Sequence, residues 1–195
     1  MLLQLEKVRK RYGPVWVLRD LSLTLDAGHN CRIHGSNGSG KSTALRIAAG
    51  LSLCDSGRVQ RGASMSYVGH DDALLTDCTV AQNLYHLARL DPQWKAQDVG
   101  KHLDGFSLQP MLHKRVRALS QGTRRKVNLV LQLASAAPLM LADEPFAGLD
   151  ESSSDYLRRC YALRVSQGAA LLWTHHGSDP LDAGSMAVRL GAENA

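Results

Sequence analysis

The sequence predicts an α/β fold with a mainly parallel core sheet, an antiparallel β portion at the N-terminal end, and a helical subdomain. Three observations support this prediction. Two continuous apolar runs, "PLMLADEP" and "AALLWTHH", are typical of parallel strands buried on both faces. The run "LSLTLD" (21–26) alternates apolar and polar residues, as a half-buried strand does. Between these strand patterns, the stretch from about Thr79 to Leu119 carries helix signals instead.

The length and charge of the chain fit one globular domain. Its 195 residues are enough to bury a core without disulfides or metals. The formal net charge of +5 suits a polyanionic ligand or an acidic membrane surface, although no dense run of Lys and Arg is present. Widely spaced cysteines without a C-x-x-C pair predict reduced, mostly buried thiols in a cytosolic protein. These cysteines are Cys31, Cys54, Cys78 and Cys160.

No segment of the sequence predicts targeting or membrane insertion. The N-terminal "MLLQLEKVRK" is charged and has no apolar signal core. No apolar run approaches the roughly 18 residues of a membrane helix. We therefore expect a protein that is soluble alone and that leaves any membrane spanning to other chains.

The first expected elements surround a glycine-rich loop. The segment "CRIHG" (31–35) is a candidate strand. After the loop, "STALRIAAG" places Leu45, Ala48 and Ala49 at helical spacing, and Gly50 provides a stop. The segments "GRVQRG" and "ASMSYVG" are expected to form short strands separated by turn residues.

Helices are expected in the middle of the chain. Thr79 and Gln82 have the spacing of a capping box for "VAQNLYHLARL", which Asp91-Pro92 would end. Two further helices are expected around 97–103 and 121–133. The last has one apolar stripe, formed by Val127, Val130, Leu131 and Ala134. The basic run 124–126 is expected to be a solvated helix face, with a partner-facing role as the alternative.

The loop "GSNGSGKS" (35–42) carries the first chemical signal. It fits G-x-x-x-x-G-K-[ST] between a candidate strand and a candidate helix, which is the context of a phosphate-binding loop. Its glycines let backbone N–H groups point at phosphates, and the helix N-terminus adds positive partial charge. We expect Lys41 to reach the β- and γ-phosphates and the Ser42 hydroxyl to bind Mg²⁺. The loop therefore predicts a nucleoside triphosphate site.

Two further segments complete the pattern. In "LMLADE" (139–144), a buried strand would deliver Asp143 to Mg²⁺ through water, while Glu144 could polarise the attacking water. An apolar run ending in Asp-Glu is also common as a core strand followed by a capping residue. Here it follows the phosphate loop by about a hundred residues, and this spacing favours the functional interpretation. In "LSQGT", Ser120 and Gly122 begin the striped helix and predict a second anion site, although the spacing alone does not exclude a plain N-cap.

Together these residues resemble the ATP-binding subunits of ABC transporters, over residues 12–175. "GSNGSGKST" resembles Walker A, "LMLADE" Walker B, "LSQGT" the LSGGQ signature, "FAGLD" the D-loop and "WTHH" the switch-histidine strand. The resemblance implies a P-loop NTPase fold of ABC type. It also implies that 1–195 is a single ATP-binding domain, with a RecA-like core over about 1–75 and 135–195 and a helical subdomain over about 76–134.

The resemblance also implies roles for individual residues. The catalytic group would be Lys41, His70, Glu144 and His175. Tyr12 would stack on adenine, and the phosphates would lie against Gly35, Ser36, Asn37, Gly38, Ser39, Gly40, Lys41, Ser42 and Thr43. Further nucleotide contacts would come from Ser120, Gln121, Gly122 and Asp150. Mg²⁺ would be held by Ser42, Asp143 and His70. The signature departs from the common form at Gln121 and Thr123, and Thr123 puts only the final side-chain contact in doubt.

His70 in "SYVGHDDALL" (66–75) stands where the family presents a glutamine to Mg²⁺ and the attacking water. From the residues alone, a metal ligand, a catalytic base, a salt-linked core histidine and a solvated loop all remain open. "YVGH", the compact length and "DEPF" resemble the haem exporter ATPases of cytochrome c maturation. We therefore expect His70 to sense the γ-phosphate and metal, with Asp71 and Asp72 beginning a partner-facing loop. The alternative is a histidine that only lines this loop.

The remaining histidines are expected to be less important. Neighbours on a strand point to opposite faces, so only one of His175 and His176 should face the nucleotide, and the family position favours His175. The others are expected to be surface or satisfied side chains: His29, His34, His86, His102 and His113.

The function implied is the ATP-binding and hydrolysing subunit of an ABC transporter, with ATP and Mg²⁺ as cofactors. Its partners would be transmembrane permease subunits at the cytoplasmic face of the inner membrane, where the chain would be peripheral. Two copies, or one copy and a second ABC ATPase, would clamp ATP head to tail, with Lys41 facing Ser120 and Gly122 of the mate. Haem export in cytochrome c biogenesis is the expected process.

Several other functions are weighed against this one. A drug, antibiotic or lipid exporter ATPase is the main alternative. ABC ATPases acting on DNA or ribosomes usually carry fused cassettes or long insertions, which this chain lacks, so no nucleic acid partner is expected. A P-loop kinase or switch GTPase would lack "LSQG".

Overall fold

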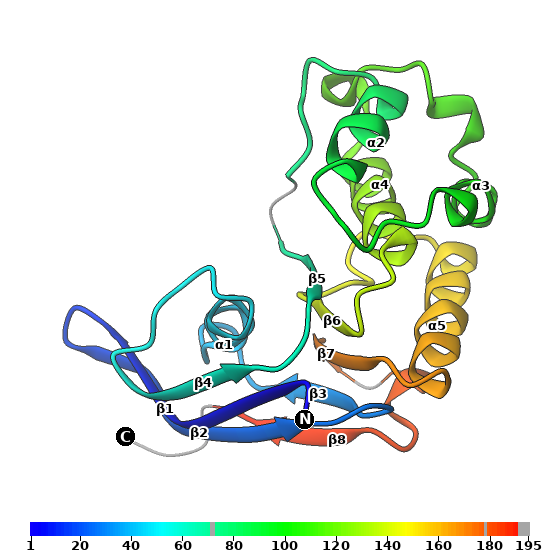
Figure 1. The fold of residues 1–195 in the computed structure, drawn as a ribbon. Helices are drawn as coiled ribbons and strands as arrows, with labels where there is room; N and C mark the ends of the chain where they lie inside the picture. The colour runs from blue at the N-terminus through cyan, green and yellow to red at the C-terminus, as the bar shows by residue number, and fades with distance from the viewer. Residues whose placement is uncertain (71–72, 178, 191–195) are drawn as a thin grey trace. The chain divides into compact units, whose positions relative to one another are not determined.

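The computed structural model describes residues 1–70, 73–177 and 179–190. The chain forms two compact units (Figure 1). The sheet unit comprises Met1–His70, Ala137–Pro145 and Tyr161–Ala195, and the helical unit comprises Asp71–Ala136 and Phe146–Cys160. Among the described residues, no helix is long and apolar enough to cross a membrane.

One sheet of the sheet unit is antiparallel and has the strand order β2-β1-β4. Its strands are β1 (Leu3–Tyr12), β2 (Val15–Leu25) and β4 (Ser56–Arg61). The expected strand at 21–26 is the second half of β2. The first half was not predicted because most of its side chains are exposed and do not alternate. It is a strand because it pairs with β1, through partners such as Tyr12 and Val15.

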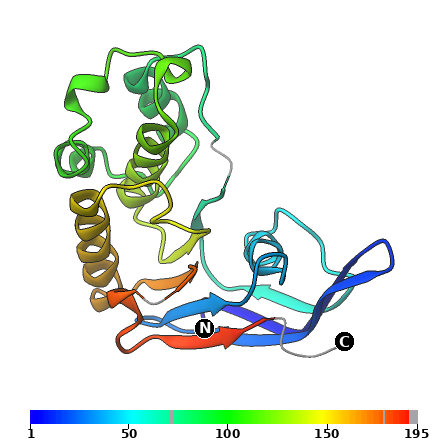
Figure 2. The ribbon, with the colours of Figure 1, turned by 180° about the vertical axis from the view of Figure 1, so that it is seen from behind.

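The other sheet is parallel and has the order β5-β6-β7-β3-β8. Every residue of β6 and β7 is buried, which confirms the prediction of buried parallel strands. In Figure 2, β3 and β8 run side by side in the same direction. The carboxyl ends of all five strands therefore meet at one edge. The strands are β3 (Asn30–His34), β5 (Met65–Val68), β6 (Leu139–Ala142), β7 (Ala170–Thr174) and β8 (Met186–Arg189).

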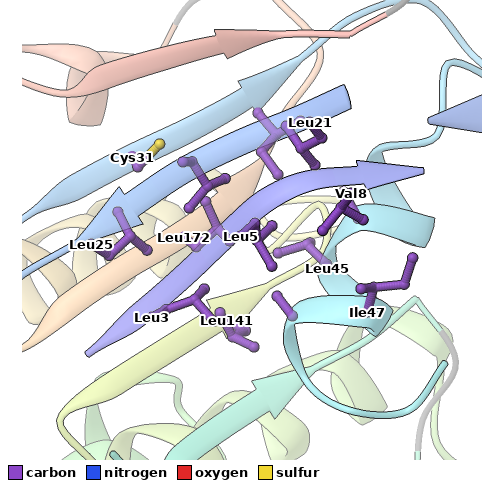
Figure 3. Packing of buried hydrophobic residues seen from close by; sticks show 14 of the residues in the cluster. Leu3, Leu5, Val8, Leu21, Leu25, Cys31, Leu45, Ile47, Leu141 and Leu172 are labelled. Atoms are coloured by element: carbon purple, nitrogen blue, oxygen red, sulfur yellow. The ribbon is translucent and has the colours of Figure 1, made fainter. Parts of the chain in front are cut away.

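The main hydrophobic core joins both sheets to α1 (Lys41–Ala48). Figure 3 shows side chains from each of these elements within one cluster, including Leu3, Leu5 and Val8 of β1, Leu45 and Ile47 of α1, Leu141 of β6 and Leu172 of β7. Burying one leucine contributes roughly 1.5–3 kcal/mol. The cluster therefore fixes β3 and α1, and with them the loop that joins the two. The stop predicted for α1 is confirmed, because Gly50 has a φ of 77° and its N–H donates to the carbonyl of Ile47.

The helical unit contains α2 (Val80–Ala88), α3 (Ala96–Gly105), α4 (Gln121–Ala134) and α5 (Glu151–Ser166) as far as Cys160. The capping box before α2 is confirmed. The Thr79 hydroxyl accepts from the N–H of Gln82 at 3.2 Å, and the side-chain oxygen Oε1 of Gln82 accepts from the N–H of Thr79 at 2.9 Å. Short 3₁₀ turns lie at Gln109–Met111 and Val116–Ala118, with a third at Pro180–Asp182 in the sheet unit.

The buried face of α4 is wider than the predicted stripe. Val127 and Val130 are buried as expected, but Leu131 is only half-buried, while Leu129 and Leu133 are buried. Both α2 and α3 pack against α4, so its apolar residues are covered on more than one side.

The prediction of mostly buried cysteines is wrong. Only Cys31 is buried, and the other three are half-buried. All four are free thiols. Burial on β3 raises the pKa of Cys31 to about 11, so this thiol stays protonated at neutral pH.

Candidate nucleotide site

The phosphate loop leads from β3 directly into α1, whose first residue is Lys41. The ammonium of Lys41 donates to the carbonyl oxygens of Gly35 and Ser36, at 3.0 Å each. Its side chain lies inside the loop, because Lys41 is only 7% exposed. The following Ser42 and Thr43 are half-buried in the first turn of α1. The lysine thus holds the loop in a closed curve through two hydrogen bonds.

Two glycines of the loop have no room for a side chain. A Cβ on Gly35 would lie 2.5 Å from both the Ser39 hydroxyl and the Leu190 carbonyl. A Cβ on Gly40 would lie 2.7 Å from a methyl of Val17, and Gly40 has a φ of 98°. The exposed residues between them, Ser36, Asn37 and Gly38, form the outer part of the loop. At these two positions the backbone therefore packs closely because no side chain is present, as a loop that binds phosphates through its backbone requires.

Asp143 follows β6 at the carboxyl edge of the parallel sheet and is 2% exposed. Its N–H donates to the carbonyl of Val68 on the neighbouring β5, at 2.8 Å. The hydroxyl of Thr174, at the end of β7, donates to Oδ1 of Asp143 at 2.7 Å. The same hydroxyl accepts from the N–H of Glu144 at 2.9 Å. One buried hydroxyl therefore orients both acidic residues.

Glu144 is held between two histidines. Its Oε2 is hydrogen bonded to Nδ1 of His175 at 3.3 Å, and its Oε1 lies 3.1 Å from Nε2 of His176. The indole of Trp173 stacks on the His175 ring, with centroids 6.0 Å apart. Glu144 has a φ of 49°, so its backbone turns sharply as it leaves the strand.

The strand-alternation argument against His176 is wrong. The strand β7 ends at Thr174, so both histidines lie beyond it and need not point to opposite faces. Both therefore reach the carboxylate of Glu144.

Tyr12 and His70 lie at two other places in the sheet unit. Tyr12 ends β1 and is 53% exposed, with the Lys10 ammonium 5.6 Å from its ring centroid. His70 follows β5 by two residues and is exposed. No described residue bonds its ring, so the structure does not join His70 to Asp143 or Glu144. Asp71 and Asp72, expected to begin the partner-facing loop, lie outside the described residues.

The signature residues open α4 in the helical unit. Ser120 is its N-cap, and the Ser120 hydroxyl accepts from the N–H of Thr123 at 3.2 Å. The hydroxyls of Ser120 and Thr123 also lie 2.8 Å apart, so Thr123 supports the cap. Gln121 is exposed, and a Cβ on Gly122 would lie 2.6 Å from the Gly148 carbonyl. This contact packs the helix tip against the D-loop.

Asp150 ends the D-loop and caps α5. Its carboxylate accepts from the Ser152 hydroxyl at 2.7 Å and from the Ser153 N–H at 2.9 Å. The Lys126 ammonium of α4 donates to it at 2.6 Å. Lys126 foremost, and then these serine donors, hold the pKa of Asp150 well below its usual range. The expectation that the run 124–126 is solvated is wrong, because all three residues are half-buried. Nε of Arg124 donates to the carbonyl of Leu119, and Lys126 joins α4 to the D-loop.

The predicted site residues fall into two groups. The sheet unit brings together the phosphate loop and, at the same sheet edge, Asp143, Glu144 and His175. It also contains Tyr12 and His70, which take no part in that network. The helical unit brings together Ser120, Gln121, Gly122 and Asp150.

Thr174 is a residue of this network that was not predicted from the sequence. Its signal was a hydroxyl residue at the end of an otherwise apolar run, directly before His175. A buried hydroxyl at a strand end needs partners, and those available were the acids that end the neighbouring strand.

The family model for ABC transporters matches residues 18–147 of this chain. The chain belongs to the ABC transporter family. It carries the family's ATP-binding, ATP-hydrolysing cassette, and the predicted α/β fold is confirmed.

Relatives and solved structures extend this result. A cytochrome c biogenesis ATP-binding export protein, CcmA, from Gluconobacter oxydans is 38% identical, over 93% of this chain and 84% of that protein. Proteins of the same name from Paraburkholderia xenovorans and Xanthomonas oryzae are 31% and 34% identical, over 91% and 83% of this chain and 91% and 80% of theirs.

Two solved structures share the fold. An ATP-binding subunit of an ABC transporter has a TM-score of 0.88 at 24% identity, over 97% of this chain and 86% of its own. A dimeric ATP-binding cassette in a post-hydrolysis state, bound to ADP and Pi, has a TM-score of 0.84 at 20% identity, over 96% and 94%.

Proposed function

We propose that this chain is the ATPase subunit that drives haem export in cytochrome c biogenesis, as part of a membrane complex with transmembrane permease subunits. The observation that carries this proposal is the 31–38% identity to export proteins named CcmA over most of the chain. Its peripheral position at the cytoplasmic face of the inner membrane follows from this assignment. The transported molecule would then be bound by the membrane subunits.

The two units would be parts of one ATP-binding domain that extends over residues 1–195. The sheet unit would form most of the RecA-like core, and residues 71–136 of the helical unit would form the subdomain that carries the signature. The boundaries after His70 and Ala136 support this division, whereas Phe146–Cys160, expected in the core, group with the helical unit.

ATP and Mg²⁺ would bind at the carboxyl edge of the parallel sheet. The glycine cradle accommodates phosphates, and Lys41 lies inside it. The oxygen donors of Ser42 and Asp143 suit a hard divalent cation. Among the described residues, no three His, Cys, Asp or Glu side chains form a metal cluster, so the protein ligands would have to be completed by phosphate oxygens and water. His70 is the proposed third contact, as a sensor of the γ-phosphate and metal. Mg²⁺ would neutralise charge on the β- and γ-phosphates when bound.

Hydrolysis would use the network around Glu144. The Glu144 carboxylate would take the proton of a water as its oxygen attacks the γ-phosphorus. The bond from that phosphorus to the bridging oxygen would break, and ADP would leave with the bond's electron pair. His175, bonded to Glu144, would orient the water, and Lys41 would stabilise charge on the phosphoryl oxygens. Tyr12, exposed at the end of β1, would stack on adenine.

A second cassette, either another copy or a different ABC ATPase, would complete the site. The tip of α4, with the exposed Ser120 and Gln121 and the half-buried Gly122, would face the γ-phosphate of the mate, because a helix N-terminus favours anions. Asp150 would stand beside this tip. ATP would then act as the bridge between two cassettes, and its hydrolysis would release them.

The first experiment traps the dimer. Glu144→Gln should lower ATP hydrolysis by roughly 10²–10³-fold while leaving nucleotide binding intact. With MgATP, this variant should sediment as a dimer in analytical ultracentrifugation. The matched control adds Ser120→Arg, which blocks the helix tip and should return the protein to a monomer. A dimer that forms equally well with the blocked tip would contradict the proposed interface.

The second experiment tests the process. The tagged chain, expressed with its neighbouring reading frames and purified in mild detergent, should elute with small multi-span membrane proteins that stimulate its ATPase activity. His70→Gln should reduce that stimulation. Unchanged stimulation would show that His70 only lines the loop.

A further inference from the structure

A pocket of about 400 Å³ lies beside the phosphate loop within the sheet unit. We name it the basic pocket. Its basic lining consists of Arg32, His34, His175, His176 and Arg189, and the Gly35–Ser36 backbone forms one wall. His34 and Arg189 end the paired strands β3 and β8, whose common direction is seen in Figure 2, and the two other histidines follow β7. The pocket therefore opens at the carboxyl edge of three neighbouring strands.

Part of this positive charge already has partners. The Arg32 guanidinium pairs with Asp182 and donates to the carbonyl of Gly177. The carboxylate of Glu144 lies against His175 and His176. Two basic side chains of the lining remain to be considered.

Arg189 and His34 are those two side chains. Among the residues that the structure describes, no carboxylate lies within ion-pair distance of Arg189, and no side chain bonds the His34 ring. In addition, Nε of Arg32 is buried and has no hydrogen-bond partner in the described part of the chain. The lining thus contains two arginines and no carboxylate, and it offers N–H donors that have no acceptor among the described residues, which suits a small anion.

The position of the pocket indicates which anion it takes. Gly35 and Ser36 belong to both the phosphate loop and the pocket wall, and His175 belongs to both the pocket and the Glu144 network. We propose that the basic pocket binds the inorganic phosphate set free by hydrolysis, before it leaves to solvent. This inference rests on the proposed ATPase function and extends it with a second, product-specific site. The volume holds a four-oxygen anion with several waters, since one water occupies about 30 Å³.

The test measures phosphate binding to the purified full chain saturated with MgADP, by ³¹P NMR or calorimetry. Arg189→Gln should weaken phosphate binding about tenfold, as loss of one charged hydrogen-bonding partner does. His34→Gln should weaken it several-fold. Both variants should hydrolyse ATP at the wild-type rate when phosphate is absent, but resist inhibition by added phosphate.

Arg19→Gln provides the matched control. Arg19 is an exposed arginine on β2 and is not part of the pocket lining. It should leave the phosphate affinity unchanged. An equal loss in this control would mean that only net charge matters and would overturn the proposal, as would unchanged affinity in both pocket variants. Displacement of phosphate by further ADP would also overturn it, because the ion would then occupy the nucleotide's own position.

The two proposals fail separately. Phosphate binding needs no turnover, so it can be lost in the pocket variants even if the wild-type chain hydrolyses no ATP. Absence of hydrolysis with the membrane partners present would contradict the proposed function alone.

Discussion

The two units hold their site residues in different ways. In the sheet unit, Asp143 and Thr174 are buried at strand ends, and one hydroxyl connects the two acids. In the helical unit, Ser120 and Asp150 act as helix caps at the surface, and their partners are mostly neighbours in sequence. The first group is oriented by the fold of several strands, and the second by local capping. The proposed catalytic groups therefore depend on long-range packing, whereas the residues proposed to meet a second cassette depend on two locally capped helix tips.

Removal of the Thr174 hydroxyl should have the largest effect. Thr174→Val keeps the shape but leaves Asp143 and the Glu144 N–H without their common partner. We expect ATP hydrolysis to fall roughly 100-fold, similar to the loss of one preorganised donor elsewhere. Steady-state kinetics would measure this, and Thr174→Ser should restore most of the activity. Equal activity in the valine variant would mean that the hydroxyl does not position the acids.

A methyl group on the phosphate loop should have the next largest effect. Gly40→Ala places a Cβ against Val17 at a positive φ, and should lower the free energy of unfolding by about 2 kcal/mol and weaken nucleotide binding about tenfold. Gly38→Ala is the control, because it has a positive φ but no atom within 4 Å of the added Cβ. Denaturant unfolding and fluorescent nucleotide titration would compare them. Similar losses in both variants would assign the effect to backbone strain alone.

The corresponding change in the helical unit should be smaller. Ser120→Ala removes an N-cap and should cost about 1 kcal/mol of stability. Nucleotide binding by the monomer should be unchanged, while ATP-dependent dimerisation of the Glu144→Gln variant should weaken. Ser120→Thr keeps the cap and separates the two effects. Loss of monomer binding in Ser120→Ala would contradict the division of roles between the units.

The Lys126–Asp150 pair should have the smallest effect. Lys126→Met should raise the pKa of Asp150 toward its ordinary value, as measured by NMR titration, and should cost about 0.5 kcal/mol at neutral pH, as exposed pairs do. The folded pKa lies below the unfolded value of about 3.9, so the stabilisation is present above that value. It is lost as the pH falls through the folded pKa, and acid unfolding below about pH 4 should therefore differ least between wild type and variant. A constant difference at all pH values would exclude this origin.

Features that depend on local sequence were predicted well. The capping box at Thr79, the Gly50 stop and the Ser120 N-cap follow from residues within four positions of one another. The buried strands β6 and β7 were predicted because their residues are apolar except Thr174, the last residue of β7. The prediction of β6 also identified Asp143 and Glu144, because these acids directly follow it in the sequence.

Features that depend on distant partners were not predicted. The first half of β2 is exposed, so only its pairing with β1 reveals it. Thr174 and Lys126 carry no periodic signal, and their roles come from residues 31 and 24 positions away. Both histidines approach Glu144 because β7 ends at Thr174. The sequence does not define the end of a strand to within one residue.

The closed curve of the phosphate loop has a consequence for how a ligand is received. Because two backbone oxygens surround the ammonium of Lys41 and little of it meets solvent, folding has already stripped most of its hydration shell. An incoming triphosphate would exchange one set of oxygen ligands for another instead of dehydrating a cation. Dehydration at this lysine would therefore add little to the barrier for nucleotide capture.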